Sequence, residues 1–304
     1  MILVAGEALY DLVLRADGGV DAHPGGGPFN TARTIGRLEQ PVAYLGRLST
    51  DRFGETHARM LADDGVGLGA VSRTDQPTTL ALAELDPAGS ARYRFYAADT
   101  AAPGLTPEHA LAALPESVAV VHVGTLGLVL EPVAAALEAV VERLSGSALV
   151  AVDPNVRPWA IDDEGAYRAR LERVLGRSQL VKVSEEDLAW LAPGRPPLEA
   201  ARDLLGLGPL VALVTRGGEG AVVVSDGEQT EVPAPRVDVV DTIGAGDAFG
   251  GGFLAWWHAR GLGRDALADH ALVVEATRYA ALVAALTCTR PGASPPRLGE
   301  VTAA

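Results

Sequence analysis

The residues with the clearest chemical potential form one short run, Asp-Thr-Ile-Gly-Ala-Gly-Asp at 241–247, which leads into aromatic residues at helical spacing. Glycines ahead of a helix allow a tight turn and point several N–H groups at one place, where the helix dipole adds positive potential. Gly244, Ala245 and Gly246 therefore predict an anion hole. Beside it, Asp247 could accept the proton of a hydroxyl that attacks phosphorus. The alternative is that the two acids of the run simply cap a helix.

A second group of residues, near the N-terminus, suits the recognition of hydroxyl groups. Asp11 interrupts an apolar strand pattern, and Asn30 follows a glycine-rich run that contains Gly26 and Gly27. A carboxylate and an amide can each bind a pair of adjacent sugar hydroxyls, while glycine lets the backbone approach the ring. These residues predict a polyol site. A plain loop and a helix cap at Asn30 explain the same residues without a ligand.

The segment Asp-Pro-Asn-Val-Arg at 153–157 directly follows an apolar strand pattern. Open α/β sheets place their ligands at the carboxyl ends of strands, so Arg157 could meet a phosphate or a substrate there. A turn held by Asp and Asn, with a solvated arginine, is the alternative.

The elements that position these residues alternate between short β-branched runs and helical patterns, which is typical of βα units and a largely parallel sheet. Helices are expected over 133–144, from about Gly246, and over 265–286. Two β-type segments, 10–24 and 78–96, break the alternation; we expect them to form a small β lid on a main domain of residues 1–9, 25–77 and 97–304. The strands expected in the main sheet cover residues 2–5, 42–45, 118–123, 148–152, 180–183, 210–214 and 221–224.

Composition excludes several classes of protein. The chain has 304 residues and a net charge of −14, which disfavours a broad basic surface for nucleic acid or anionic lipid. It has one cysteine, so no intrachain disulfide is expected, and we expect a cytoplasmic protein without a membrane span. Lys182 is the one lysine and there is no Walker motif, so a phosphate-binding field is expected from arginine, backbone N–H groups, a helix N-terminus or a metal.

The chain resembles the ribokinase-like (PfkB) carbohydrate kinases over essentially its full length. The run at 241–247 resembles the C-terminal signature of that family, and residues 25–32 resemble the N-terminal one. The resemblance implies an α/β fold with a mostly parallel sheet flanked by helices and a small β-sheet lid. It also implies ATP as the donor, Mg²⁺, and Asp247 as the base that activates a sugar hydroxyl while the N–H groups of residues 244–247 hold the phosphoryl group.

The same resemblance implies three further sets of residues. Ser184 and Asp187 replace the Asn and Glu that organise Mg²⁺ in the family, so metal ordering through Asp187 would be indirect or shared with Glu186. A capping box explains these residues equally well. The other two sets lie in a glycine-rich loop that would bind the nucleotide and in a loop that would bind a monovalent cation, and ordinary turns are the alternative explanation for both. The implied nucleotide-binding residues are Ser184, Thr215, Gly217, Gly218 and Gly220, and the implied ligands of a monovalent cation such as K⁺ are Asp241, Ile243 and Gly292.

Fructokinases are the members that the chain resembles most, through Gly-Glu-Ala-Leu-Tyr-Asp at 6–11, the segment at 153–157 and Tyr-Arg-Phe-Tyr at 93–96. Arg94 and Tyr96 are therefore expected to contact the sugar. A 2-keto-3-deoxygluconate kinase is the alternative, with Arg94 or Arg157 binding the substrate carboxylate. A ribokinase-type enzyme and a non-catalytic sugar sensor also stay open. The family implies a homodimer formed through the lid.

Overall fold

Strand β1 (Ile2–Ala5) is fully buried and lies inside a nine-stranded sheet, in the order β13-β12-β11-β10-β9-β8-β1-β4-β5. The computed structural model describes residues 1–15, 17–85 and 91–304. The strands from β11 to β5 run parallel, and β12 and β13 add an antiparallel edge. Besides β1, the sheet contains β4 (Val42–Ser49), β5 (Val71–Thr74), β8 (Val120–Gly124), β9 (Leu149–Asp153), β10 (Leu180–Ser184), β11 (Val211–Thr215), β12 (Ala221–Ser225) and β13 (Glu228–Val232).

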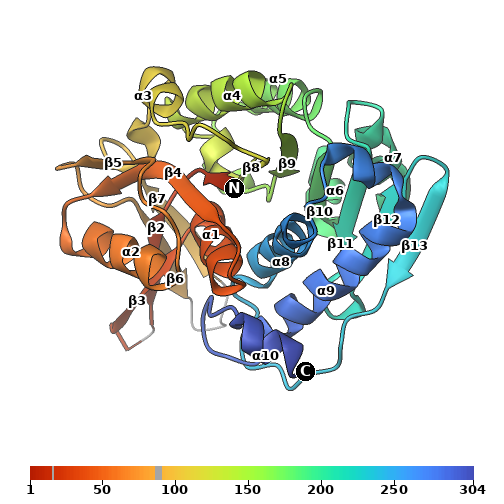
Figure 1. Cartoon of the computed structure of the whole chain (residues 1–304). Coiled ribbons are helices and arrows are strands. Elements are labelled where there is room, and N and C mark those ends of the chain that lie inside the picture. Colours follow the sequence, from red (N-terminus) through yellow and green to blue (C-terminus); the bar gives the residue numbers. More distant parts are fainter. Residues whose placement is uncertain (16, 86–90) are drawn as a thin grey trace.

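Helices cover both faces of this sheet because its central strands are apolar on both sides. Leu3 and Ala5 belong to one core, whereas Ile2 and Val4 belong to the other. Figure 1 shows α8 and α9 side by side, with α1 on the other side of α8. One core includes α1 (Gly27–Arg37), α2 (Arg52–Asp63), α8 (Ala245–Ala259) and α9 (His270–Cys288), and the other includes α3 (Pro107–Ala112), α4 (Val133–Leu144), α5 (Glu164–Leu175), α6 (Glu185–Leu191) and α7 (Pro197–Leu205); α10 (Leu298–Thr302) follows near the C-terminus.

A second, four-stranded sheet lies at the end of the molecule opposite β12 and β13 (Figure 1). Its order is β3-β2-β6-β7, with β2 and β6 parallel and the outer pairs antiparallel. Residues 86–90, a Pro/Gly stretch that predicts the turn of a hairpin within the expected lid segment 78–96, lie outside the described residues. This small sheet consists of β2 (Leu9–Leu14), β3 (Val20–Gly25), β6 (Leu80–Leu85) and β7 (Ala91–Tyr96).

The expected fold class is observed, and all seven expected strands form; their ends are shifted by at most two residues, except that β4 continues four residues beyond its expected end to Ser49. The sequence reasoning missed β5 and β13, two strands at the sheet edges whose side chains are largely not buried. The helix expected over 265–286 forms as α9, but it starts five residues later than expected, at His270, and ends at Cys288. It starts there because the Asp269 side chain accepts the N–H groups of Ala271 and Leu272 and caps the helix.

Helix α9 is long and apolar enough to cross a membrane by length and composition. In the fold it packs against α8 and against β12 and β13, and half of its apolar window is buried inside the protein. It is therefore a core helix of this fold, and Glu275 and Arg278 interrupt its apolar sequence.

Candidate active site

Two cavities meet at the N-terminus of α8. The first, of about 540 Å³, lies between the carboxyl ends of the main-sheet strands and the small sheet, and is lined by Asp11, Asn30 and Asp247 among others. The second, of about 680 Å³, lies next to the carboxyl ends of β10 and β11. Gly246 lines both cavities, so the helix start separates two spaces large enough for small ligands.

The turn into α8 has the geometry of an anion hole. Gly244 is the N-cap and adopts a left-handed conformation with φ of 75°. A Cβ at Gly244 would also come within 2.6 Å of the Ala293 side chain, so both backbone angle and space require glycine. Because Ala248 makes the first intrahelical hydrogen bond, to the Gly244 carbonyl, the N–H groups of Gly246 and Asp247 precede the hydrogen-bonded helix. The sequence prediction of an anion hole thus has the expected local structure.

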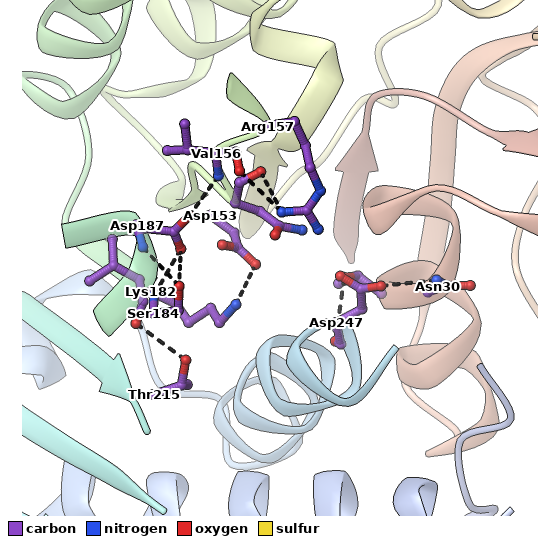
Figure 2. Close-up of polar contacts among 12 residues, drawn as sticks. Asn30, Asp153, Val156, Arg157, Lys182, Ser184, Asp187, Thr215 and Asp247 are labelled. Atoms are coloured by element: carbon purple, nitrogen blue, oxygen red, sulfur yellow. Dashed lines mark hydrogen bonds and ion pairs between the residues drawn. The ribbon is translucent and has the colours of Figure 1, made fainter. Parts of the chain in front are cut away.

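Asp247 lies at this turn and faces the first cavity. Its Oδ2 accepts a hydrogen bond of 2.9 Å from Asn30 Nδ2, which joins α8 to α1 (Figure 2). Burial raises the pKa of Asp247 to about 6, and the charge of Asp153 adds to this effect, whereas the Asn30 bond and the nearby Lys182 and Arg157 oppose it. A carboxylate with this pKa is ionised at neutral pH and basic enough to take a proton from a hydroxyl.

Most of the residues predicted to bind a sugar line the first cavity: Asp11, Gly26, Gly27, Asn30 and Arg157. Desolvation of its carboxyl group by the surrounding protein raises the pKa of Asp11 to about 6, although the charge of Arg157 lowers it. The two others, Arg94 and Tyr96, lie on the outer strand β7 with exposed side chains and are not among the residues that line either cavity.

Glu7 is a wall residue of the first cavity for which the sequence reasoning named no role. Only 1% of it is exposed, and its carboxyl group accepts the N–H groups of Gly127 at 2.8 Å and Gly27 at 3.3 Å. Burial raises the pKa of Glu7 to about 8, and the negative charge of Asp247 contributes in the same direction. A lone acid two residues after the apolar run of β1 was the signal that could have identified it.

Lys182 is the second residue that the sequence reasoning missed. It lies on β10, lines the first cavity and forms an ion pair of 2.9 Å with Asp153 at the end of β9 (Figure 2). The expectation that arginine, backbone or metal supplies the positive field here was therefore incomplete, since a lysine ammonium lies beside the α8 turn. The pattern Val-Lys-Val in an apolar strand was the available signal, because a lysine at such a position is buried.

The five predicted nucleotide-binding residues come together around the second cavity. Ser184, Thr215, Gly217, Gly218 and Gly220 all line it, from the ends of β10 and β11 and the turn that follows. The opposite wall is mainly apolar and suits a flat aromatic base. Its residues include Ala234, Pro235, Val237, Val239, Phe249, Ala281, Ala284 and Ala285.

Asp187 caps α6 together with Ser184. One carboxylate oxygen accepts the Val156 N–H at 2.7 Å, and the other accepts both the Ser184 N–H and its hydroxyl at 2.8 Å (Figure 2). With these hydrogen bonds on both oxygens, Asp187 holds the loop after β9 in place. Its neighbour Glu186 lines the second cavity.

The three residues predicted to hold a monovalent cation also lie together. Asp241 accepts the N–H groups of Ile243 at 3.0 Å and Gly292 at 2.8 Å, so its carboxylate joins the two loops. Although burial works against it, these backbone bonds lower the pKa of Asp241 and keep it ionised. Backbone carbonyls around an ionised carboxylate are suitable donors for a monovalent cation.

Comparison with known proteins agrees with this geometry. The sequence matches the pfkB family of carbohydrate kinases over residues 1–298. A fructokinase of Rhizobium leguminosarum bv. trifolii is 35% identical over 259 residues, which cover 84% of this chain and 79% of that protein. The structure of Xylella fastidiosa fructokinase with bound ATP is similar with a TM-score of 0.90 and 29% identity, covering 99% of this chain and 97% of that one.

Vibrio cholerae fructokinase is a further structural relative. Its structure with fructose, ADP and a calcium ion has a TM-score of 0.87 and 26% identity, over 99% of this chain and 97% of that one. The chain therefore belongs to the pfkB family of carbohydrate kinases, and the expected ribokinase-like fold is confirmed. The expectation of a carbohydrate kinase is confirmed with it.

Proposed function

We propose that this protein is an ATP-dependent fructokinase. The observation that carries the proposal is the position of Asp247, at a helix N-terminus that separates a polar cavity from a second cavity with a glycine-rich loop and an apolar wall. The matched fructokinases support fructose as the sugar. Fructose would bind in the first cavity and ATP in the second, with its γ-phosphate at residues 244–247.

In this mechanism each residue has a defined task. Asp247 takes the proton of the attacking sugar hydroxyl, while Asn30 orients the carboxylate through the hydrogen bond to Oδ2. The N–H groups at the start of α8 stabilise the charge on the phosphoryl group during transfer. Asp11 and Arg157 bind the other hydroxyls, and the small sheet acts as a lid that excludes water from the reaction.

Mg²⁺ would enter with the nucleotide. It usually keeps several waters and is held by one or two carboxylates together with substrate phosphates. Glu186, which lines the second cavity, fits that role, whereas Asp187 would act indirectly through the loop that it caps. When bound, the ion would neutralise charge on the phosphates.

A K⁺ ion would be held by Asp241, Ile243 and Gly292, next to the turn that forms the anion hole. A structure of a Vibrio cholerae fructokinase double mutant contains a potassium ion together with fructose and ADP. We expect removal of K⁺ to lower turnover, because this loop fixes the backbone that precedes Gly244.

The arrangement in solution is a homodimer formed through the small sheet. Its outer strand β7 carries Tyr96, which is 52% exposed, and Val20 on β3 is 55% exposed. Light scattering tests the dimer: a fully active monomer at assay concentration would show that it is not needed. The location that we propose for the protein is the cytoplasm.

The direct test is release of ADP from ATP and Mg²⁺ with fructose, 2-keto-3-deoxygluconate and ribose as acceptors. We expect fast turnover on fructose, and a loss of about 10²- to 10⁴-fold in Asp247→Asn, which removes the base. Asp226→Asn is the matched control, because Asp226 is exposed and lines neither cavity. Unchanged turnover in Asp247→Asn would refute the assignment of the base.

Arg157 keeps one alternative open, because a cation in the first cavity could bind the carboxylate of 2-keto-3-deoxygluconate. Turnover on that acid but not on fructose, lost in Arg157→Met, would select this alternative. Binding of sugar and nucleotide by calorimetry without any transfer would instead show a sugar sensor with a kinase fold.

A further inference from the structure

Lys182 lies where the two halves of the site meet. Its side chain is only 9% exposed and extends from β10, between the main sheet and the start of α8 (Figure 2). A Cβ built on Gly246 would lie 3.1 Å from its Nζ, so the ammonium is in contact distance of the anion-hole turn. Lys182 also lines the first cavity together with Asp247.

The ammonium has hydrogen-bonding capacity beyond its ion pair. A lysine ammonium carries three N–H donors, and in the described part of the chain one of them is given to Asp153 Oδ2 at 2.9 Å. The negative charges of Asp153, Asp187 and Asp247 outweigh the effect of burial and raise the pKa of Lys182. Lys182 is therefore a permanent cation with donors left for an anion beside Gly246.

Phosphoryl transfer at the start of α8 would bring several negative charges together, which a cation such as Lys182 can balance. A phosphoryl group that arrives at the α8 N-terminus brings negative charge close to the carboxylates of Asp153 and Asp247. The helix N-terminus supplies about half an elementary charge of opposite sign, which does not balance them. A buried ammonium acts in low dielectric, where one charge has a large effect on a developing negative charge.

We propose that Lys182 contacts the transferring phosphoryl group and stabilises its charge, and that Asp153 is the positioning residue that holds the ammonium at that place. This inference rests on the proposed function of the protein as a kinase. It assigns the one lysine of the chain a part in catalysis, in addition to the backbone anion hole.

The experiment compares Lys182→Met and Lys182→Arg with Arg170→Met. Arg170 is a matched control, since it is a partly buried cation on α5, paired with Glu131 and Glu138, and it lines neither cavity. We expect kcat with fructose to fall about 100-fold or more in Lys182→Met, with KM for fructose changed by no more than about threefold. Lys182→Arg should recover at least about tenfold of that loss, because it restores the charge.

A second readout does not depend on turnover. Calorimetry with AMP-PNP and with ADP, both with Mg²⁺, measures the contribution of the γ-phosphate to affinity. The parent and Arg170→Met should prefer AMP-PNP, and Lys182→Met should lose about tenfold or more of that preference. In Asp153→Asn the same preference should fall in part, because the ammonium stays but is no longer held in place.

The outcomes distinguish failure of the proposed fructokinase function from failure of the proposed role of Lys182. If the parent does not phosphorylate fructose, the proposed function fails, while the nucleotide preference still tests Lys182. A Lys182→Met protein that keeps kcat and its preference for AMP-PNP overturns the inference. So does a variant whose melting temperature and fructose affinity fall while kcat is kept, because the lysine would then have only a structural role.

Discussion

Lowering the pH from 7 to 5 should reduce kcat/KM through the protonation of Asp247. In the free protein the pKa of this carboxyl is raised to about 6, mainly by burial. A single group with that pKa is about 90% ionised at pH 7 and about 10% at pH 5, so kcat/KM should fall about tenfold over this range. A carboxyl with the ordinary value of 3.8 would stay ionised by more than about 90% at pH 5 and would give a nearly flat profile.

Asp11 needs a control in this experiment, because its pKa is also raised to about 6 and it lines the same cavity. The coupled assay is therefore run from pH 4.5 to 8.5 on the parent and on Asp11→Asn, with saturating ATP and fructose well below KM. If Asp247 is the base, Asp11→Asn loses affinity but keeps an acidic limb near pH 6. If Asp11 and Asp247 both titrate, kcat/KM of the parent should fall more steeply at low pH than the titration of a single group allows.

Lys182→Met provides an internal check. Lys182 lowers the pKa of Asp247, so its removal should shift the acidic limb to higher pH. Asp153 raises the same pKa, so its removal should shift the limb to lower pH. A profile that stays flat between pH 7 and 5 would refute the reasoning from burial. So would a limb that disappears in Asp11→Asn, which would assign the titration to substrate binding.

Two other perturbations test the surroundings of the base. The pKa of Glu7 is raised from 4.5 to about 8, so between these pH values the folded state keeps a proton that the unfolded state releases. The free energy of unfolding should therefore fall by up to about 1.4 kcal/mol per pH unit as the pH rises through this range. Glu7→Gln should remove this dependence, so urea denaturation at pH 5 and pH 8 should show the variant gaining stability relative to the parent at pH 8; an equal difference at both pH values would contradict the shift. Gly244→Ala should lower kcat at least about tenfold in a folded protein, because a Cβ there meets Ala293 at 2.6 Å and the backbone is left-handed; activity kinetics and circular dichroism check this, and unchanged kcat would mean that the turn does not need glycine.

The sequence predicted the parts of the fold and site that depend on local patterns. The apolar runs gave the central strands because a strand buried on both faces reads as continuous Val, Leu and Ala. The run at 241–247 gave the start of α8, since glycine and acid residues at a helix N-terminus act through backbone geometry within one turn. The edge strands β5 and β13 were missed because they lack that apolar signal.

The charge states in the site could not be read from local patterns. The raised pKa of Glu7 depends on complete burial, which outweighs the opposing effect of backbone donors 20 and 120 residues away, at Gly27 and Gly127. Lys182 looked like an isolated basic residue in the sequence, and only the pairing of β9 with β10 brings it to Asp153. Arg94, by contrast, is on the small sheet as expected but is not among the residues that line the first cavity, so its contact with the sugar stays a prediction.

Asn30 shows why the first cavity favours a polyol. Its Nδ2 is used by Asp247, across 217 residues of chain, while its Oδ1 is buried without a partner among the described residues. A buried acceptor that lacks a hydrogen bond costs about 1–3 kcal/mol, a cost that a hydroxyl donor in the cavity removes. A ligand with several hydroxyls satisfies Asn30 and Asp11 together, whereas an apolar ligand of the same size leaves both without partners. In the proposed fructokinase, Asn30 would therefore orient the base through Nδ2 and accept a sugar hydroxyl through Oδ1, so that binding and catalysis would depend on one side chain.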